Sequence, residues 1–566
     1  MPNGASRPRG RTLAEFLDGL GQLSPAEHKL LEACVIGEPA SIDETLRPEH
    51  RTDENQIRAR FLRFIALGGD EGAPVHEKGV HVRGAWIDGD IDLEACHVTG
   101  PITLDWCHVD GEINLLDAEI PCLFLDNSFA NGIDAERLRC PGSVHIHNGT
   151  FVDGKVSLVC AHIGGDLDCV GARFENREEE CLDCQGAEIR GSVFLGREGD
   201  TRSLHATGNV DFTGTQVDGD VFCRRARFEG EVWFIGARIK GDLDFSLCCF
   251  PGPADRSEII LSRAEVGGRF IFRKTTGEVE RIILRGTTVS AIVDDMGSWK
   301  VAHELLLDGF QYSRFIDAHI MDEPSIWTPE VSLTDATSRI AWLDRQRKED
   351  LQIDFKPQPW EQLVKVLREM DHQEGAKKVA IAKQARIRKS KLAFDLLHRA
   401  YGLLCDYGYR PGRLIVWAFV VALIWAALFK LGASSGVMAP TDRRMVEEIG
   451  DATCRPEYGG NWTTCASLHR RGYPSFDPLV YSFDLILPVI ATQQTKDWAP
   501  LTTVPCRDIN ALGFCKERFS EAISTSTSGY WPLGIIFWLF ARVENLLGWI
   551  FGLLFVAIVS GIIKKD

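Results

Sequence analysis

The chain has 566 residues, enough for several domains, and carries a formal net charge of −17 with a sequence pI near 5.4. A general nucleic-acid-binding protein normally presents a basic face, so this acidic balance excludes nucleic acid as an expected partner. The first twenty residues contain arginines but no apolar run like that of a signal peptide. We therefore expect the first half of the chain to lie in the cytosol.

Residues 1–78 predict a helical N-terminal cap. The segments TLAEFLDGL, SPAEHKLLEAC and ENQIRARFLRFIAL each place apolar residues three or four positions apart. Ser24, Pro25 and Glu27 have the pattern of a helix start. A repetitive segment follows whose first strand would otherwise expose unpaired backbone groups, and covering that edge is the expected role of the cap.

Residues 79–316 contain an eleven-residue repeat. From Gly89 the chain reads GDIDLEACHVT, GPITLDWCHVD and GEINLLDAEIP, and from Gly208 it reads GNVDFTGTQVD, GDVFCRRARFE, GEVWFIGARIK and GDLDFSLCCFP. Position 1 is glycine, positions 3, 5 and 10 are apolar, and position 8 is small. Positions 3 and 5 have the spacing of a strand, and glycine at position 1 permits a corner with positive φ. The pattern predicts a mainly β fold, a parallel and right-handed β-solenoid in which two eleven-residue half-coils form a coil of about 22 residues.

The repeat also predicts which side chains point into the solenoid. Val221 and Leu243 occupy inward positions, whereas Arg224 is expected on the outer surface. Short insertions interrupt the repeat and are expected to project as loops, where recognition residues tend to collect. Aspartate recurs at position 2, where we expect a solvated corner, at Asp90, Asp166, Asp220 and Asp242.

Two groups of solenoid residues have the types that carry chemistry. Cys181 and Cys184 form a CxxC motif, which can lower a thiol pKa, but the repeat places Cys184 at an inward position, as a small buried hydrophobe. His145 and His147 could share a metal ion, yet no Cys or acid completes a set at ligand spacing, which favours surface histidines. GxGxxG, Walker A and HExxH motifs are absent from the sequence, so no catalytic residue, cofactor or metal site is predicted.

Residues 317–405 predict a linker and a basic helical hairpin. The segments WEQLVKVLREM and AKKVAIAKQARIRKSKLAFDLLHRAYGLL have helical spacing and are joined by a short turn. The alternative interpretation of the second segment is a solvated linker. We expect five of its basic side chains to contact anionic lipid head groups, namely Lys383, Arg386, Arg388, Lys389 and Lys391.

Two apolar segments predict transmembrane helices, within residues 406–432 and 531–566. Leu414–Phe429 and Leu546–Ile563 carry no charge and are close to the shortest length that spans a bilayer, about 17 residues. The alternative is a pair of buried helices in a soluble domain. Lys and Arg residues precede the first segment and follow the second, which places both ends of the chain in the cytosol.

Residues 433–530 are therefore expected to form an extracytoplasmic segment. Its short apolar run, 478–491, is interrupted by Asp484 and Pro488, and we expect a re-entrant or interfacial helix there. An even number of cysteines in an oxidising compartment predicts two disulfides, with three pairings open. The cysteines are Cys454, Cys465, Cys506 and Cys515.

Several segments together resemble a bacterial family of two-span proteins with a cytosolic β-solenoid. They are VHEKGVHVRGAWIDGDIDL, LLLDGFQY, QPWEQLVKVLREM, YGYRPGR, YSFDLILPVI and LLGWIFG. Members of this family are often labelled membrane-associated oxidoreductases, and the resemblance implies a bacterial inner-membrane location but no cofactor residue. The YGYRP segment and the hairpin are also distantly similar to pentapeptide-repeat proteins whose two spans flank an ion-channel pore loop. The run 478–491 lacks a TVGYG-like filter.

Three functions are compatible with this organisation. The first, which we expect, is a membrane protein without evident catalysis that displays its solenoid as a binding, scaffolding or sensing surface. Its partners would be membrane lipids and a cytosolic protein or ligand. The second is a homo-oligomeric channel or pore with 478–491 as its constriction, since two spans cannot enclose an aqueous path alone. The third is a membrane-associated oxidoreductase that uses thiols.

Overall fold

The computed structural model divides the chain into two compact units, Met1–Ser390 and Lys391–Asp566, and each is described by itself. The described residues are 12–43, 47–177, 179–196, 202–251, 257–316, 334–390, 395–450, 453–456, 460–487, 492–505, 510–515 and 528–560.

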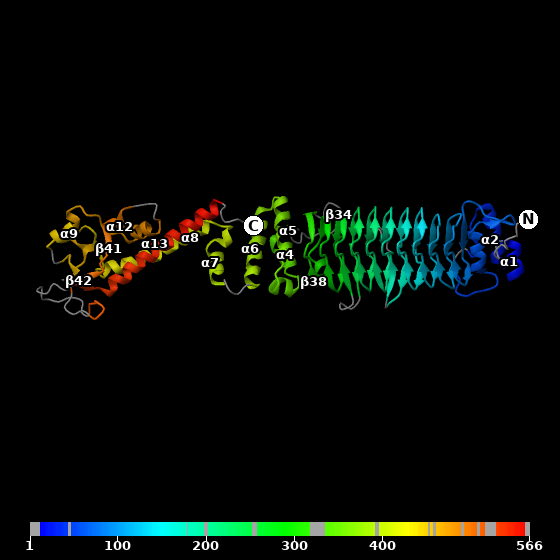
Figure 1. The fold of residues 1–566 in the computed structure, drawn as a ribbon, viewed down its shortest axis with the longest axis horizontal. Coiled ribbons are helices and arrows are strands. Elements are labelled where there is room, and N and C mark those ends of the chain that lie inside the picture. Colours follow the sequence, from blue (N-terminus) through cyan, green and yellow to red (C-terminus); the bar gives the residue numbers. More distant parts are fainter. Residues whose placement is uncertain are drawn as a thin grey trace, which may run out of the picture. The chain divides into compact units, whose positions relative to one another are not determined.

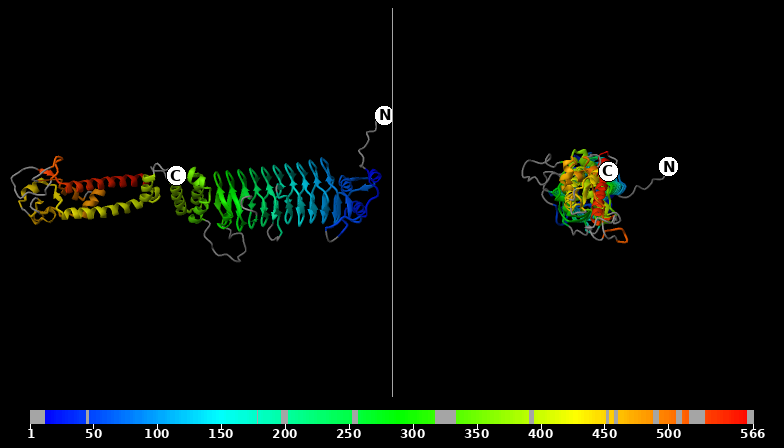
Figure 2. Two further views of the ribbon diagram at one scale, coloured as in Figure 1. Left: turned by 90° about the horizontal axis from the view of Figure 1, so that it is seen from below. Right: turned by 90° about the vertical axis from the view of Figure 1, so that its left-hand side faces the viewer.

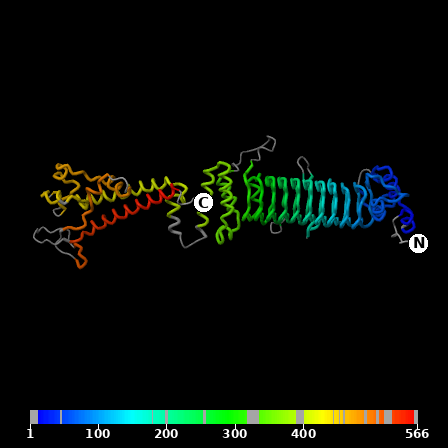
Figure 3. The backbone as a smooth tube through the Cα atoms, turned by 45° about the horizontal axis from the view of Figure 1, so that its top comes forward, coloured from blue at the N-terminus to red at the C-terminus, as the bar shows by residue number. Residues whose placement is uncertain are grey.

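The first unit contains a parallel β-solenoid, as the repeat predicts (Figures 1 and 3). Two of its sheets have ten strands each, so the coil repeats about ten times. Each complete coil carries four short strands, two from each eleven-residue unit, and equivalent strands of successive coils pair in parallel. Val221 pairs with Leu243, which lies two repeat units further along the chain and confirms the predicted length of the coil.

The strands form three main sheets. The first sheet contains β2 (Gln56–Arg58), β6 (Trp86–Asp88), β9 (His108–Val109), β12 (Phe129–Ala130), β16 (Phe151–Asp153), β20 (Arg173–Glu175), β24 (His205–Ala206), β28 (Arg227–Phe228), β32 (Cys249–Phe250) and β35 (Thr276–Gly277). The second contains β7 (Ile91–Asp92), β10 (Ile113–Asn114), β13 (Ile133–Asp134), β17 (Val156–Ser157), β21 (Glu180–Asp183), β25 (Asn209–Asp211), β29 (Val232–Trp233), β33 (Glu258–Ile260), β36 (Val279–Ile283) and β38 (Ala302–Leu306).

The third sheet joins two rows of strands and so covers the two remaining sides of the coil. One row is β1 (Ala40–Ser41), β5 (Val80–Arg83), β8 (Ile102–Asp105), β11 (Leu123–Asp126), β15 (Val144–His147), β19 (Leu167–Asp168), β23 (Val193–Gly196), β27 (Val221–Cys223), β31 (Leu243–Asp244), β34 (Glu265–Phe272), β37 (Thr288–Asp294) and β39 (Gln311–Phe315). The other is β14 (Arg139–Cys140), β18 (His162–Ile163), β22 (Glu188–Ile189), β26 (Gln216–Val217) and β30 (Arg238–Ile239).

Glycine at position 1 more often allows the backbones of successive coils to pack closely than it forms a corner with positive φ. Gly89 has positive φ, but most position-1 glycines do not. A Cβ added to Gly230 would lie 2.6 Å from the backbone of Gly208 in the preceding coil. The corners with positive φ occur at position 7, where Ala95 and Trp106 have φ of 51° and 53°. The predicted glycine corner is therefore wrong for most coils, because their backbones touch at this position.

The aspartates at position 2 link successive coils, which corrects the expectation of a merely solvated corner. Asp90 Oδ1 accepts the Glu112 N–H at 3.0 Å, and Asp220 Oδ1 accepts the Asp242 N–H at 2.7 Å. Ser192 Oγ accepts the Asp220 N–H at 3.1 Å in the same way. A side-chain acceptor at position 2 thus satisfies an amide of the next coil at the point where the glycine backbones pack together.

Apolar side chains at the inward positions fill the solenoid. Val221 and Leu243 are fully buried, as predicted. Arg224 was expected to be exposed, but it is half-buried and its Nε atom is enclosed. The pairing register shifts in β23 next to this residue, where Gly196 packs against the Arg224 carbonyl oxygen.

The N-terminal cap contains the helices α1 (Leu13–Leu20), α2 (Pro25–Ile36) and α3 (Ala59–Ala66), followed by the hairpin β3–β4 (Gly69–Asp70 and Ala73–Pro74). The predicted helix start is confirmed, because Ser24 and Glu27 form a capping box. The solenoid begins earlier than residue 79. Strand β1 pairs with β5 and β2 pairs with β6, so the cap also supplies strands to the first coil.

A helical cap also closes the C-terminal end of the solenoid. It comprises η2 (Ser298–Val301), α4 (Ala336–Leu343), η4 (Glu349–Ile353), α5 (Gln358–Glu369) and α6 (Gln373–Ser390). Arg339 in α4 forms a bidentate ion pair with Asp294 in β37, with two N–O distances of 2.7 Å, and neither side chain is exposed. Trp299 Nε1 donates to the same carboxylate at 2.6 Å, and Phe315 lies 3.7 Å below the guanidinium carbon. This buried cluster attaches the cap to the last coils.

The second unit is built on two long helices that lie side by side, α8 (Gly412–Ser434) and α13 (Pro532–Val559) (Figure 2). Helix α7 (Asp395–Cys405) and the short η6 (Asp406–Gly408) precede α8. The residues between α8 and α13 form β40 (Met438–Pro440), α9 (Arg443–Glu448), η8 (Trp462–Thr464), α10 (Ala466–Arg470), α11 (Pro478–Ile486), α12 (Gln494–Asp497), β41 (Trp498–Pro500), β42 (Thr503–Pro505) and β43 (Ser528–Tyr530).

Both long helices are long and apolar enough to cross a membrane, with window mean hydropathies of 2.4 and 1.7. Only 22% of each apolar window is buried, which argues against two core helices of a soluble domain. Helix α13 begins at Pro532, so the predicted span that starts at Leu546 is the second half of a longer continuous helix. Exposed apolar side chains such as Ile415, Leu546 and Leu553 cover both helices.

Candidate functional site

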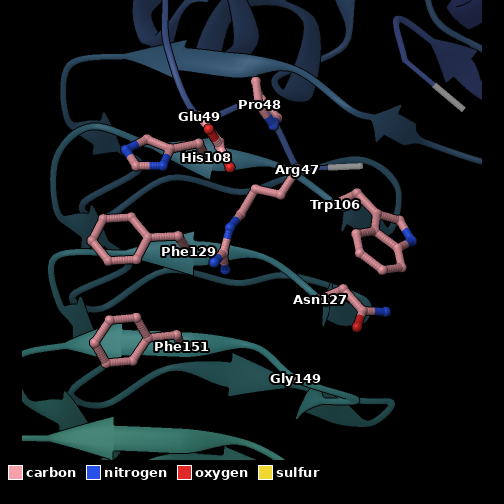
Figure 4. A pocket seen from close by; sticks show the side chains of 9 residues that line it. All are labelled: Arg47, Pro48, Glu49, Trp106, His108, Asn127, Phe129, Gly149 and Phe151. Carbon is pink, nitrogen blue, oxygen red and sulfur yellow. The ribbon is translucent and has the colours of Figure 1, made fainter. Parts of the chain in front are cut away.

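An open groove of about 520 Å³ lies on the outer surface of the solenoid, near its N-terminal end (Figure 4). One wall is a row of side chains on the first sheet, His108, Phe129 and Phe151. The other wall is a row of corner residues, each two positions earlier in the chain. Arg47 extends into the groove between the two rows, and Glu49 lies at its rim beside His108 (Figure 4).

The repeat positions the first row as an aromatic ladder, by which we mean Trp86, His108, Phe129 and Phe151. These residues occupy equivalent positions in successive coils, since β6, β9, β12 and β16 pair in order. The Trp86 and His108 rings stack at 3.8 Å, and those of His108 and Phe129 at 4.5 Å. Parallel pairing in register therefore stacks the rings of successive coils on one another, except that the Phe151 ring is tilted by 59° to that of Phe129.

The groove combines the cationic side chain of Arg47 with aromatic and polar neighbours. The guanidinium carbon of Arg47 lies 5.9 Å from the Phe129 ring centre, and Arg47 Nη1 donates to the Ser128 carbonyl oxygen at 3.2 Å. Burial lowers the pKa of His108, so its ring is neutral at pH 7. The sequence did not predict this groove, because Arg47 lies in the predicted helical cap, far from the repeat. The aromatic residue that recurs at position 9 could have indicated the aromatic wall.

The CxxC cysteines belong to the solenoid core, as the repeat predicts. Cys181 and Cys184 have no exposed surface. Burial raises the pKa of Cys181 to about 12 and holds the pKa of Cys184 well above its usual value. A thiol that is protonated and enclosed is a poor nucleophile, so this geometry does not support redox chemistry at the motif.

His145 and His147 have an acidic neighbour that the sequence spacing did not reveal. Asp168 lies in the next coil, where it pairs in register with His145. One ligand atom from each of the three side chains lies within 4.8 Å of the others. The signal was present in the coil length, because a residue about two repeat units further on shares the same face.

The basic residues predicted to contact lipid face other parts of the first unit. Lys383 Nζ lies 3.2 Å from Glu361 Oε1, and its side chain is only 6% exposed. Arg386 pairs with Asp344, with Nε to Oδ1 at 3.0 Å, and lies over the Trp360 ring. Packing of α6 on the helical cap therefore gives these two side chains partners within the first unit. The side chains of Arg388 and Lys389, and all of Lys391, lie outside the described residues.

The cysteines of the segment between the long helices are in part oxidised. Cys454 and Cys465 form a disulfide, which selects one of the three open pairings. Cys515 is also disulfide-bonded. Cys506 lies outside the described residues. Cysteines elsewhere in the described residues are free thiols.

The predicted re-entrant run contains helix α11, which packs against both long helices. Ser482 Oγ donates to the Ala422 carbonyl oxygen at 2.9 Å, near the middle of α8, and contacts the Glu544 carboxylate of α13. Asp484 accepts the backbone N–H groups of Thr492 and Thr495 at 2.5 and 3.2 Å, so its carboxylate stabilises the returning chain. Pro488 lies outside the described residues.

The acid that lies deepest in this unit was not predicted. Glu544 interrupts the apolar sequence of α13 and has no exposed surface. Its Oε2 atom has no hydrogen-bond partner among the described residues. An enclosed carboxylate on a candidate membrane helix is a feature of ion and proton pathways. The sequence did contain a sign of this site, because the charged residues within 542–545 interrupt the apolar sequence of the helix.

No family model matches this sequence, and the searches of curated proteins and of solved structures found no match either.

Proposed function

We propose that the chain is a two-span protein of a bacterial inner membrane that displays its solenoid to the cytosol as a ligand-binding surface. The length, apolarity and exposure of α8 and α13 support the membrane location. The disulfide between the spans supports an oxidising compartment on that side. The groove with its aromatic ladder is the observation that carries the binding role.

The groove favours a ligand that combines a planar or apolar group with an anionic or carbonyl oxygen. The rings of His108, Phe129 and Phe151 provide an aromatic wall for the ligand to contact. Arg47 provides a guanidinium, which pairs with carboxylates and phosphates in fixed geometry. The volume of about 520 Å³ is within the range of small-molecule sites, about 300–1,000 Å³.

We expect Phe129→Ser and Arg47→Ala to abolish ligand retention by the full chain. Each variant removes a group that faces the groove, and neither removes an inward side chain. Native mass spectrometry of the protein extracted from its own membranes in mild detergent would detect the retained species. The wild-type protein is expected to carry a ligand or partner that both variants lose.

Phe222→Ser is the matched control. Phe222 stacks on Phe194 at 5.4 Å in the third sheet. The variant therefore also removes one ring of an outward-facing aromatic pair, but it leaves the groove intact. We expect this variant to retain the same species as the wild type. A wild-type protein without any bound species, or equal retention by all variants, would contradict the binding role.

A homo-oligomeric pore is the second candidate, and the position of α11 favours it. This helix has nine residues, too few to span a bilayer, and it packs beside the middle of α8 with Ser482 against Glu544. A short helix at membrane depth is stable only where it is enclosed by protein or lines water.

Conductance of the purified full chain in planar bilayers separates the two candidates. A protein that only displays its solenoid leaves the bilayer electrically silent, and this is the result we expect. Cation current that Glu544→Gln changes would instead establish the pore. Glu544 is a better probe than Asp484, because Asp484 already accepts two backbone N–H groups.

A further inference from the structure

We propose that His145, His147 and Asp168 form a binding site for a divalent transition-metal ion of the zinc type on the outer surface of the solenoid. The site lies on the third sheet, on strands β15 and β19, and it does not depend on a ligand in the groove. Its three side chains come from two successive coils, which the parallel register holds side by side.

The geometry of the three side chains fits one ion. Their ligand atoms lie within 4.8 Å of one another. Around a tetrahedral zinc ion, bond lengths of about 2.0–2.1 Å place ligand atoms roughly 3.4 Å apart. Small χ rotations of the two half-buried histidines close this difference, since the backbone already places all three on one face.

The carboxylate of Asp168 is held in place before any ion binds. Asp168 is 3% exposed, and its Oδ1 accepts the Val170 N–H at 3.0 Å. The same turn recurs at other strand ends of the solenoid, for example at Asp244 with Ser246, and at Asn114 with Leu116. Only at Asp168 does the recurring turn face a pair of histidines, among the described residues.

The surroundings favour an ordered donor set. His145 packs edge-on against Phe124 at 4.9 Å, and Phe194 is the register partner of Asp168 on the other side. These rings restrict the rotamers of the ligands. Asp126 pairs in register with His147 and adds negative charge near the site, which attracts a cation.

The donor set points to the class of ion. Two imidazoles and one carboxylate suit zinc, iron, cobalt or nickel, whereas calcium and magnesium prefer an all-oxygen set. Three protein ligands leave a position open to solvent or to a fourth ligand. The site therefore either fixes two coils to each other or presents a metal-bound water at the solenoid surface.

The test is a Co²⁺ titration of the full chain in mild detergent after treatment with a chelator. We expect one Co²⁺ per chain, d–d absorption typical of nitrogen and oxygen ligands, and displacement by Zn²⁺. Asp168→Asn keeps the turn, as Asn114 shows, but removes the anionic ligand. Asp168→Asn and His147→Ala are each expected to weaken binding by more than about tenfold.

Two controls give the test its specificity. Asp244→Asn changes the equivalent turn in another coil, and His162→Ala removes an exposed histidine on the adjacent row. Both are expected to keep the wild-type affinity within about twofold. Equal affinity of Asp168→Asn and Asp244→Asn would overturn the proposal. A thiolate-to-cobalt charge-transfer band would overturn it as well, because it would locate the ion at the free cysteines.

Discussion

Replacing Arg339 by Met is expected to destabilise the first unit by about 3–5 kcal/mol. Both members of the ion pair have no exposed surface, so the substitution leaves the Asp294 carboxylate in the interior without its cationic partner. The neutral Trp299 Nε1–H still donates to the carboxylate but does not balance its charge. Differential scanning calorimetry of the full chain would show the loss as a lower unfolding temperature. Hydrogen exchange should localise the change to β37, β39 and α4.

Two further variants define the cause of this effect. Arg314→Met removes an exposed arginine from the neighbouring strand β39 and should cost less than about 0.5 kcal/mol. Asp294→Asn combined with Arg339→Met removes both charges and should recover part of the loss, since the cost comes from an unpaired buried charge. If Arg339→Met and Arg314→Met unfold alike, the pair does not attach the cap to the solenoid.

The second large effect is expected at Val217, where substitution by Asp should cost more than about 4 kcal/mol. Val217 is 2% exposed and pairs in register with Ile189 and Ile239, so the new carboxylate would lie between two apolar coils. Chemical denaturation followed by circular dichroism would measure the loss in the full chain. We expect this variant to unfold at clearly lower denaturant concentration.

Gln216→Asp is the matched control for this substitution. Gln216 precedes Val217 in the same strand but is exposed, between Glu188 and Arg238 of the adjacent coils. The same carboxylate should therefore change stability by less than about 1 kcal/mol. Similar denaturation midpoints for the two variants would show that the assignment of inward and outward positions is wrong.

The solenoid is predictable from the sequence because a short period determines which residues stack. Positions 3 and 5 correctly identify inward residues such as Val221, and the doubled unit gives the length of the coil. The structural role of individual repeat positions is harder to predict from the sequence. Glycine at position 1 and aspartate at position 2 act between coils, through close backbone contact and an N–H acceptor that only the stacked structure reveals.

The candidate sites are less predictable, since each joins segments that lie far apart in the sequence. Arg47 meets Phe129 across the boundary of the predicted cap, and Arg339 meets Asp294 across a segment that has no repeat. Asp168 completes the histidine pair because the coil brings a residue about two repeat units further along the chain beside His145, a distance that local ligand spacing does not cover. The basic residues of α6 had the right composition for lipid contact, but packing on the cap partners Lys383 and Arg386.

The most direct measurement of the central claim is labelling with a membrane-impermeant maleimide in intact bacterial spheroplasts. Cys160 is an exposed free thiol on the solenoid, and Gly450→Cys would place a second thiol at an exposed position between α8 and α13. The account predicts that the cysteine at position 450 reacts in intact spheroplasts, whereas Cys160 reacts only after the membrane is permeabilised. Reaction of Cys160 in intact spheroplasts, or protection of both sites, would contradict a two-span protein that displays its solenoid to the cytosol.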